Sequence, residues 1–351
     1  MKKILLTLLV SIVLIGVTAC SGSKNTAAPS DSKATASSGD SKGAKVIKLG
    51  SVNNDKHTLH DGYEKFKEIV EKETDGKVKV EIYANGLLGN DRTMIEGLEL
   101  GTIEAVGVST SMLANWAPSM LAYDLPFSIS SEEVADKILD GPYGQKSAEQ
   151  LEKEGILLLG YMENGFRHLT NSKREIESLD DLKGLKIRTM QTPLILETWK
   201  ELGTNPTPMA YTELFTAMEQ KVIDGQENPY GNMALDKFYE VQKYLTKTNH
   251  SYNPMGLVVS KKFYDKLSKD EQSILKEAGL EASAYQRKLN REKSEEYLKI
   301  LEDNGMVATD LSEKERKKFE DKVQNVYKGF SDEIGQEYLD QYLAELKKYE
   351  K

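Results

Sequence analysis

The stretch GLKIRTMQTP, residues 184–193, has an arginine in a position where it can bind an anion. Leu185 and Ile187 alternate with polar neighbours, as in a short half-buried strand, and Arg188 lies near the end of that strand. The parallel N–H donors of a guanidinium match both oxygens of a carboxylate, a geometry that lysine cannot reproduce. From these residues alone, Arg188 is either an anion ligand or an ordinary surface charge at a strand edge.

Other polar side chains with suitable chemistry follow the ends of expected strands. HTLH (57–60) comes after an expected strand at 45–52, and GNDR (89–92) comes after one at 77–83. Ligand sites in α/β sheets form beyond strand ends, so both segments are expected near a site. The candidates in these segments are His57, Asn90 and Arg92.

Glu163 follows an apolar run at 156–162 that is typical of a buried central strand. Its carboxylate can accept a hydrogen bond from a sugar hydroxyl, which makes Glu163 a further candidate.

His57 and His60 have the i, i+3 spacing of a chelating pair, but no second group of ligands lies near them in the sequence. We therefore predict no metal site.

Signatures of catalysis are missing from the sequence. It contains no G-x-G-x-x-G, G-x-S-x-G or H-E-x-x-H motif. The only cysteine, Cys20, directly follows the N-terminal apolar run, so no cysteine is left to act as a nucleophile. We predict a protein that is not an enzyme and has no catalytic residues and no cofactor. An exported enzyme acting on small organic acids is kept as an alternative.

The N-terminus has the pattern of an export signal. Lys2 and Lys3 precede the apolar run ILLTLLVSIVLIGV, and the small residues of VTAC (17–20) end at Cys20. This pattern resembles a bacterial lipobox, which implies cleavage before Cys20 and lipid on its sulfur and on the new amino terminus. The alternatives are a plain signal peptide, or an N-terminal membrane anchor with an incidental cysteine. We predict that residues 1–19 are a lipoprotein signal peptide.

Residues 20–44, Cys20 followed by SGSKNTAAPSDSKATASSGDSKGA, contain no large apolar side chain. Such a segment cannot bury enough surface to fold, so we predict a flexible tether between the membrane and a folded domain. No later apolar run approaches the ~18 residues of a membrane span.

The 47 basic and 56 acidic residues give a formal net charge of −9, which argues against nucleic acid as a partner because phosphate binding needs a basic face.

The chain from Lys45 onward alternates expected strands and helices. Strand, helix, strand, helix and strand follow one another between 45 and 110, an order that predicts a mainly parallel, doubly wound sheet. From residue 267 onward the chain is mostly helical, and it includes a helical stretch longer than about 25 residues, which needs something to lie along. Two α/β lobes bridged by one long helix would provide this support.

Three stretches, ENGFRHLTN (163–171), DLKGLKIRTMQTP (181–193) and NPTPMAYTELFTAMEQKVIDGQENP (205–229), closely resemble the substrate-binding proteins of tripartite ATP-independent periplasmic (TRAP) transporters. The upstream YANGLLGNDRTMIEGLELGTIEAV and the DLPF at 124–127 fit the same family. The resemblance covers nearly the whole chain from about Lys45, and the DGQENP element together with the upstream arginine strand is its most specific part.

The resemblance implies a type II periplasmic-binding-protein-like fold, an α/β fold with two lobes, crossover connections and one long helix spanning both. The expected division is lobe I at 45–164, with about 253–290 returning to it, and lobe II at 165–252, with about 291–351 packing across and onto it.

The resemblance also implies ligand-binding roles. In the family, the arginine at the position of Arg188 forms a bidentate ion pair with the ligand carboxylate. Asn228 corresponds to a ligand-contacting asparagine, although an asparagine before proline can also simply shape a turn. Arg167 corresponds to a second arginine near the ligand, or it makes a structural salt bridge between lobes. Tyr211 stands at the place of an aromatic wall, or packs in the core, and Gln191 lies in an MQ pair that resembles members binding sugar acids.

These roles predict an exported, lipid-anchored receptor at the outer face of the cell membrane. It would capture an organic acid through an arginine–carboxylate clamp and deliver it to the membrane subunits of a TRAP transporter for ion-gradient-driven uptake. A sugar acid (uronate or aldonate) is favoured over a C4-dicarboxylate on the resemblance around IRTMQ (187–191). Ser109 stands where sialic-acid-binding relatives have an acidic residue, which disfavours sialic acid. A ligand-sensing receptor for a membrane kinase remains an alternative, because it would use the same two-lobed clamp.

Overall fold

The computed structural model describes residues 43–349. The predictions of a signal peptide at 1–19, of lipid on Cys20 and of a tether as far as residue 42 lie outside the described residues. From Gly43 onward the chain forms one compact unit. Within the described part, no helix combines the length and the apolar character needed to cross a membrane.

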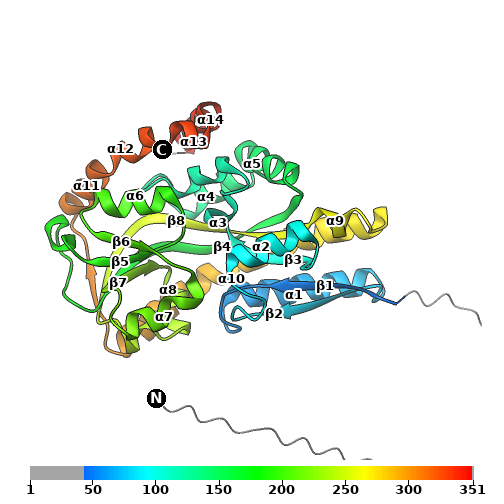
Figure 1. The fold of residues 1–351 in the computed structure, drawn as a ribbon, viewed down its shortest axis with the longest axis horizontal. Coiled ribbons are helices and arrows are strands. Elements are labelled where there is room, and N and C mark those ends of the chain that lie inside the picture. Colours follow the sequence, from blue (N-terminus) through cyan, green and yellow to red (C-terminus); the bar gives the residue numbers. More distant parts are fainter. Residues whose placement is uncertain (1–42, 350–351) are drawn as a thin grey trace, which may run out of the picture. The chain divides into compact units, whose positions relative to one another are not determined.

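One mixed sheet of nine strands runs through this unit (Figure 1). The strands follow the order β2-β1-β3-β8-β4-β7-β5-β6, and β9 pairs with β8. We call β2, β1 and β3 the first half of the sheet and β7, β5 and β6 the second half; β4 and β8 join them. The bounds are β1 Lys45–Gly50, β2 Val78–Tyr83, β3 Ala105–Ser109, β4 Ile156–Asn171, β5 Lys186–Thr189, β6 Asn205–Pro208, β7 Gly225–Asn228, β8 Tyr244–Ser260 and β9 Val307–Asp310.

β4 and β8 are long antiparallel strands that cross from one half to the other. β4 has 16 residues and β8 has 17, and their pairing is interrupted by three register shifts. The strand expected at 156–162 therefore continues to Asn171, where β4 pairs with β7. The sequence did not indicate this extension, because ENGFRHLTN is polar although most of its residues are buried.

The prediction of a mainly parallel sheet is right at the flanks and wrong in the centre. β1 is parallel to β2 and β3, and β5 is parallel to β6 and β7. β8 is antiparallel to β3 and β4, and β4 is antiparallel to β7. The direction changes because β4 leads the chain from the first half into the second and β8 leads it back.

Helices lie on both sides of the sheet (Figure 1). Alternate residues of β8 show this in the packing: Leu257 and Val259 belong to a core cluster with α1 and α10, whereas Val258 belongs to a different cluster. The bounds are α1 Thr58–Glu73, α2 Asp91–Leu100, α3 Thr110–Leu113, α4 Glu132–Leu139, α5 Pro142–Lys153, α6 Pro193–Glu201, α7 Tyr211–Glu219, α8 Tyr230–Leu235, α9 Lys261–Tyr264, α10 Lys269–Asp303, α11 Glu313–Lys322, α12 Gln324–Gly329, α13 Ser331–Ile334, α14 Gln336–Tyr349 and the 3-10 helices η1 Pro118–Asp124, η2 Leu179–Leu182 and η3 Phe238–Glu240.

The long helix expected after residue 267 is α10, which has 35 residues. It begins with a capping box, in which the Ser268 hydroxyl accepts from the backbone of Glu271 and the Glu271 carboxylate accepts from the backbone of Ser268. α10 packs along α1 and β4 and also contacts α8, so it lies against both halves of the sheet. The prediction of one long bridging helix is confirmed.

The predicted lobe boundaries fall inside the two crossing strands. Residue 164 lies within β4 and residue 252 lies within β8, so each strand would belong to both lobes. The compact unit does not separate there, and the lobe division stays a prediction. Of the C-terminal helices, α12 contacts α6, whereas α14 contacts α4 and α5.

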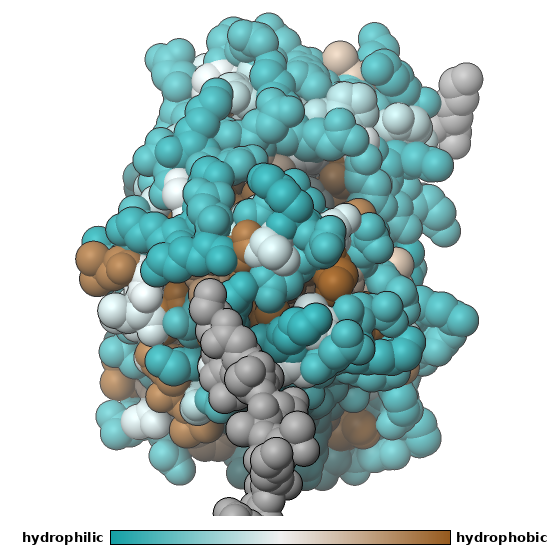
Figure 2. Space-filling view, turned by 90° about the vertical axis from the view of Figure 1, so that its right-hand side faces the viewer, coloured by the Kyte–Doolittle hydropathy of each residue, from teal (hydrophilic) through white to brown (hydrophobic). Residues whose placement is uncertain are grey.

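Apolar side chains gather inside the unit in three core clusters. The face shown in Figure 2 is covered mainly by hydrophilic residues, and its apolar areas are small and separated. This distribution is normal for a folded domain, and this face shows no large continuous apolar patch that would mark a binding surface.

Candidate functional site

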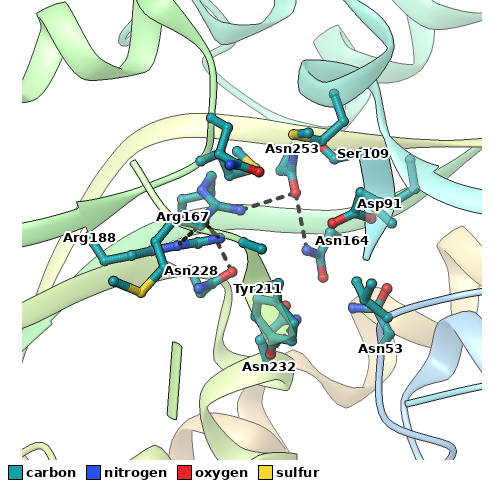
Figure 3. A pocket seen from close by; sticks show the side chains of 17 residues that line it. Asn53, Asp91, Ser109, Asn164, Arg167, Arg188, Tyr211, Asn228, Asn232 and Asn253 are labelled. Carbon is teal, nitrogen blue, oxygen red and sulfur yellow. Dashed lines mark hydrogen bonds between the residues drawn. The ribbon is translucent and has the colours of Figure 1, made fainter. Parts of the chain in front are cut away.

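A pocket lies between the two halves of the sheet, where β3, β4, β5, β7 and β8 meet the segments after β1 and before α7 (Figure 3). The space at this site that protein atoms leave free, open solvent included, is about 450 Å³. It is lined by Val52, Asn53, Asp91, Ser109, Met112, Asn164, Arg167, Arg188, Met190, Gln191, Met209, Ala210, Tyr211, Asn228, Asn232, Asn253 and Met255. The lining thus combines two guanidinium groups with many neutral amides and four methionines, which adapt their shape easily.

Arg188, on β5, is 2% exposed and makes no ion pair within the described part of the chain. Its Nε and Nη2 donate to the carbonyl oxygen of Met209 at 3.0 and 2.8 Å, and its Nη1 has no hydrogen-bond partner. Burial lowers the pKa of Arg188 to about 10, so the group stays charged at neutral pH. A buried cation without a counter-charge is costly, and an anion in the pocket would remove that cost.

Arg167, on β4, is buried as deeply but is fully paired. It forms an ion pair with Glu227 through two nitrogens, and its Nη1 and Nη2 donate to the side-chain oxygens of Asn253 at 3.1 Å and Asn228 at 3.2 Å. Burial alone would raise the pKa of Glu227, but Arg167 and a hydrogen bond with His250 outweigh burial and lower that pKa to about 2. The charge of Arg167 is therefore balanced within the framework, across the neighbouring strands β4 and β7.

The pairing of Arg167 fixes the orientation of two amides in the pocket. Asn253 must present its oxygen to Arg167, and its Nδ2 donates to the Ser109 hydroxyl at 2.8 Å. Asn164 must then donate its own Nδ2 to the same Asn253 oxygen, at 3.1 Å. The Oδ1 of Asn164 is left buried without a partner. The pocket thus contains an unused hydrogen-bond acceptor.

A second unused acceptor belongs to Asn232, on α8. The Tyr211 hydroxyl donates to the Asp236 carboxylate and accepts from Nδ2 of Asn232 at 3.1 Å. Since the tyrosine proton is already given to Asp236, Asn232 can only turn its amide nitrogen toward Tyr211. Its Oδ1 remains buried without a partner. The Tyr211 ring in turn lies 5.9 Å from the guanidinium carbon of Arg188, within the range of a cation–π contact.

Asp91, at the start of α2, is the one carboxylate among the described residues that line the pocket. Burial raises the pKa of Asp91 to about 6, although the charge of Arg188 opposes that shift. The sequence had pointed to its neighbours Asn90 and Arg92. Asn90 instead caps α2 by accepting from the backbone of Thr93, and the exposed Arg92 pairs with Glu96 at 3.0 Å, so neither lines the pocket.

His57 also lies outside this pocket. It is the N-cap of α1, where its Nδ1 accepts from the backbone N–H of Leu59 at 3.1 Å. Burial lowers the pKa of His57 to about 4, so the ring is neutral at physiological pH. Its position after a strand end, which made it a candidate, reflects helix capping.

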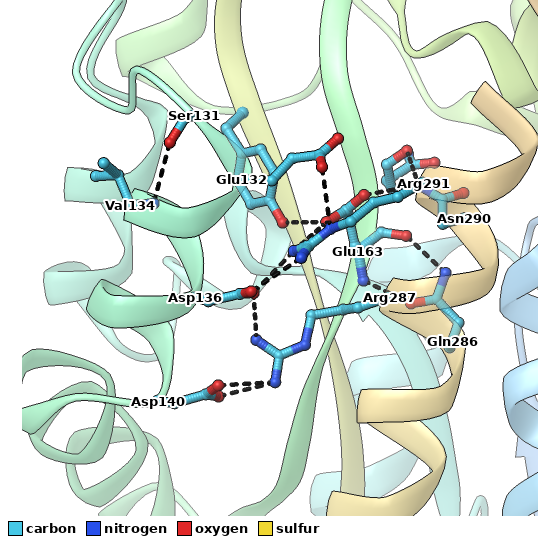
Figure 4. A network of polar contacts seen from close by, with 12 residues as sticks. Ser131, Glu132, Val134, Asp136, Asp140, Glu163, Gln286, Arg287, Asn290 and Arg291 are labelled. Atoms are coloured by element: carbon cyan, nitrogen blue, oxygen red, sulfur yellow. Dashed lines mark hydrogen bonds and ion pairs between the residues drawn. The ribbon is translucent and has the colours of Figure 1, made fainter. Parts of the chain in front are cut away.

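Glu163 belongs to a polar network on the α10 side of β4 (Figure 4). Its carboxylate accepts from Tyr252 at 2.7 Å, from Asn290 at 3.0 Å and from Arg291 at 2.8 Å. Arg291 continues the network to Asp136 on α4, at 2.8 Å. Glu163 is thus fully occupied in holding α10 to β4 and does not line the pocket.

Five predicted ligand residues come together in the pocket and four do not. The five that line it are Arg188, Asn228, Arg167, Gln191 and Tyr211. The four outside it are His57, Asn90, Arg92 and Glu163. Besides Ser109, which was considered only for its bearing on sialic acid, the polar lining residues that were not predicted as ligand contacts are Asn53, Asp91, Asn164, Asn232 and Asn253. Asn53 and Asp91 follow strands that were recognised, whereas the orientations of the other three depend on contacts between distant segments.

No group of three or more metal-binding side chains occurs in the region that the structure describes. The pocket can instead offer one charged donor, at Arg188, and three acceptors, at Asp91, Asn164 and Asn232. This combination suits a small molecule that carries both an anionic group and hydroxyl groups.

The chain is similar to known proteins over most of its length. A family model described as bacterial extracellular solute-binding protein, family 7, matches residues 49–333. The 2,3-diketo-L-gulonate-binding periplasmic protein YiaO of Escherichia coli is 34% identical over 304 residues, covering 86% of this chain and 88% of that protein. The C4-dicarboxylate-binding periplasmic protein DctP of Rhodobacter capsulatus is 32% identical over 299 residues, covering 84% and 89%.

A similar fold is found among solved structures. The sugar acid binding protein of Advenella mimigardefordensis, in complex with galactonate, gives a TM-score of 0.85 at 42% sequence identity, covering 87% of this chain and 98% of that one. The predicted architecture, a two-lobed type II periplasmic-binding-protein-like α/β fold, is confirmed at this level.

Proposed function

Because the chain belongs to the bacterial extracellular solute-binding proteins of family 7, the receptors of TRAP transporters, we propose that it captures a sugar acid and delivers it to the membrane subunits of such a transporter. The family consists of solute receptors rather than enzymes. Ion-gradient-driven uptake by the membrane subunits would follow the delivery.

Arg188 is the proposed carboxylate ligand. Its guanidinium is buried and makes no ion pair with any described residue, and its Nη1 is an unused donor. A carboxylate that accepts from this nitrogen would neutralise the charge and replace its lost hydration. Asn228 and Gln191, which also line the pocket, supply further amide groups.

The unused atoms of the pocket are the observation that carries the choice of a sugar acid. Besides the donor on Arg188, Oδ1 of Asn164 and Oδ1 of Asn232 need donors, and the Asp91 carboxylate accepts as well. Hydroxyl groups of an aldonate or uronate can donate to all of them. A C4-dicarboxylate such as succinate has no donor, and its second carboxylate would meet Asp91 and no second free cation among the described lining residues, since Arg167 is balanced by Glu227.

Calorimetric titration of the chain from Gly43 onward tests this proposal, because this part forms a compact unit. The probes are D-galactonate, D-galacturonate, succinate and galactitol, which has the hydroxyl groups without a carboxylate. We expect a sugar acid to bind at least about tenfold more tightly than succinate, since a polar site rejects ligands that leave its groups unpaired, and we expect no binding of galactitol. Tighter binding of succinate than of either sugar acid would contradict the choice of ligand.

The variant Asp91→Asn, measured in the same titration, tests whether Asp91 contributes to the choice of ligand. It removes the negative charge that opposes a second carboxylate, so the ratio of the two dissociation constants, succinate over sugar acid, should become smaller. An unchanged preference would remove Asp91 from the selection of ligands while leaving the role of Arg188 untouched.

We also propose export and lipid anchoring through Cys20. The lipobox-like VTAC at 17–20 supports this, together with the absence of any other cysteine from the sequence. In a bacterial host, the full chain should appear in the membrane fraction and incorporate labelled fatty acid, and Cys20→Ser should not incorporate the label. Labelling that persists in Cys20→Ser would contradict the proposed attachment.

A further inference from the structure

The pocket must open for any ligand to enter. Arg188 and Asn228 are each 2% exposed and Asn253 is 1% exposed, so the groups proposed to bind ligand are closed off from solvent. Segments from both halves of the sheet close the pocket, and the contacts between them must break and re-form in each binding cycle. Side-chain contacts between the two halves are therefore candidates for controlling ligand release.

One such contact joins the loop after β1 to the end of α8. Nδ2 of Asn54 donates to Oδ1 of Asp236 at 3.1 Å. The side-chain oxygen of Asn54 accepts from the backbone of Lys56 at 2.9 Å, which holds its amide in this orientation. Asp236 is the C-cap residue of α8, the helix that follows β7, whereas Asn54 follows β1. The contact therefore connects a segment next to the first half of the sheet with a segment next to the second half.

Asp236 also reaches the ligand site through Tyr211. Its Oδ2 accepts from the Tyr211 hydroxyl, and the Tyr211 ring lies 5.9 Å from the guanidinium carbon of Arg188. The two oxygens of one carboxylate thus connect a closing contact to the aromatic ring beside the proposed carboxylate ligand. Neither Asn54 nor Asp236 lines the pocket itself.

The two halves also meet at a second point close to Tyr211. A Cβ added to Gly86, in the turn after β2, would lie 2.8 Å from Cγ2 of Thr212, the residue after Tyr211. Gly86 has a φ of +69°, so glycine is favoured there by both the backbone and the space. The start of α7 is therefore held against the first half of the sheet on this side as well.

We propose that Asn54 and Asp236 form a latch that keeps the pocket closed and positions Tyr211 against Arg188. This inference rests on the proposed function, because it takes the pocket to be the ligand site. Asn54 and Asp236 are positioning residues that act through Tyr211 and do not touch the ligand. Breaking the latch should speed the release of ligand more than it slows capture, since most effects on affinity appear in the dissociation rate.

An exchange of the two latch residues provides the test. Asn54→Asp places two carboxylates face to face and removes the donor, whereas the double variant Asn54→Asp with Asp236→Asn restores one donor and enough acceptors. In the double variant, the new amide oxygen can accept from Tyr211 and the new amide nitrogen can donate to the new carboxylate at position 54, so both side-chain bonds of Asp236 have counterparts. Only the longer contact from Nδ2 of Asn54 to the carbonyl oxygen of Leu235, at 3.5 Å, is lost. The control is Asn325→Asp, the same change at an exposed position on α12.

Stopped-flow kinetics with D-galactonate as probe gives the readout. We expect Asn54→Asp to raise the dissociation rate about tenfold, since losing a hydrogen bond to a charged group commonly costs that much or more, with a change in association rate of less than about threefold. The double variant should return the dissociation rate to within about threefold of the wild type. Asn325→Asp should match the wild type, and melting temperatures without ligand should show that all variants are folded.

The outcomes separate the latch from the ligand site. If Asn54→Asp releases ligand at the wild-type rate, or if the exchange fails to rescue it, the latch is overturned. If Arg188→Lys then still weakens binding by at least about 30-fold, the proposed function stands without the latch. If the wild type binds none of the acids tested, the proposed function fails and the latch fails with it.

Discussion

Two buried arginines in the same pocket differ in how their bonds are used. Arg167 and Arg188 are each 2% exposed, yet Arg167 has a carboxylate and two amide oxygens around it and Arg188 has one backbone carbonyl. The first is bound to its own framework, and the second has an unused donor. Burial and charge alone therefore do not separate the two arginines of this pocket; the unused bonding capacity of Arg188 does.

The network around Glu163 extends this comparison to the other side of β4. Glu163 and Asn164 are neighbours in the sequence, but the Glu163 carboxylate accepts from three side chains while Asn164 keeps an unused oxygen (Figures 3 and 4). The side of β4 that carries Glu163 has its hydrogen bonds satisfied and holds α10 to the sheet. The side that carries Asn164 lines the pocket and keeps an acceptor that a ligand can use.

Removing the partner of Arg167 should have the largest effect on stability. Glu227→Gln leaves the Arg167 guanidinium buried without its counter-charge, and we expect a loss of about 3–5 kcal/mol in the free energy of unfolding, the usual cost of breaking a buried ion pair. Urea unfolding at neutral pH measures this change.

The matched variant for that experiment is Arg188→Met. Because Arg188 makes no ion pair with any described residue, its loss should leave the free energy of unfolding within about 1 kcal/mol of the wild type or raise it. If both variants destabilise the protein equally, the distinction between a framework arginine and a ligand arginine is wrong.

His57 is a third buried group with an unused bonding atom, and we expect it to have a smaller effect on the free energy of unfolding that depends on pH. Its Nε2 is buried and unpaired like Nη1 of Arg188, but it lies outside the pocket and the ring is neutral. The pKa of His57 is about 4 in the folded state, while an unfolded histidine has a pKa of about 6.5. The unfolded chain therefore takes up the proton first, and stability present above pH 6.5 is lost as the pH falls toward 4, by roughly 3 kcal/mol for this group.

The variant His57→Asn isolates this contribution. Asparagine is a good N-cap and can still accept from the backbone of Leu59, but it does not titrate. Urea unfolding at pH 7 and pH 5 should show a smaller loss for the variant than for the wild type. Equal losses would mean that His57 is not the group that binds the extra proton.

Much of the fold could be predicted because its signals are local. α2 is the second of the two helices expected between 45 and 110, and both its ends have local signals: Asn90 caps its start and Gly101 ends it in the left-handed conformation. The far part of β4 could not be predicted, because its buried residues are polar and only their partners on β7 and β8 make a strand there favourable. Apolar periodicity cannot detect such a segment.

The site was predictable where strand pattern and family resemblance coincide, as at Arg188, and where the resemblance alone names the residue, as at Asn228. It was not predictable where one residue within a recognised segment matters: GNDR contains the pocket residue Asp91, but the sequence pointed to Asn90 and Arg92 on either side. The first turn of α2 decides which of the three side chains faces the pocket. The unused oxygen of Asn164 depends on Asn253, 89 residues later, and no short motif contains that information.

Calorimetry on Arg188→Lys tests the central claim most directly. Lysine keeps the positive charge but cannot present parallel donors to a carboxylate, so affinity for the preferred acid should fall by at least about 2 kcal/mol, roughly 30-fold. The free energy of unfolding without ligand should stay close to that of the wild type. Unchanged affinity in a folded Arg188→Lys variant would contradict the account, because the unused donor of Arg188 would then have no part in binding the acid.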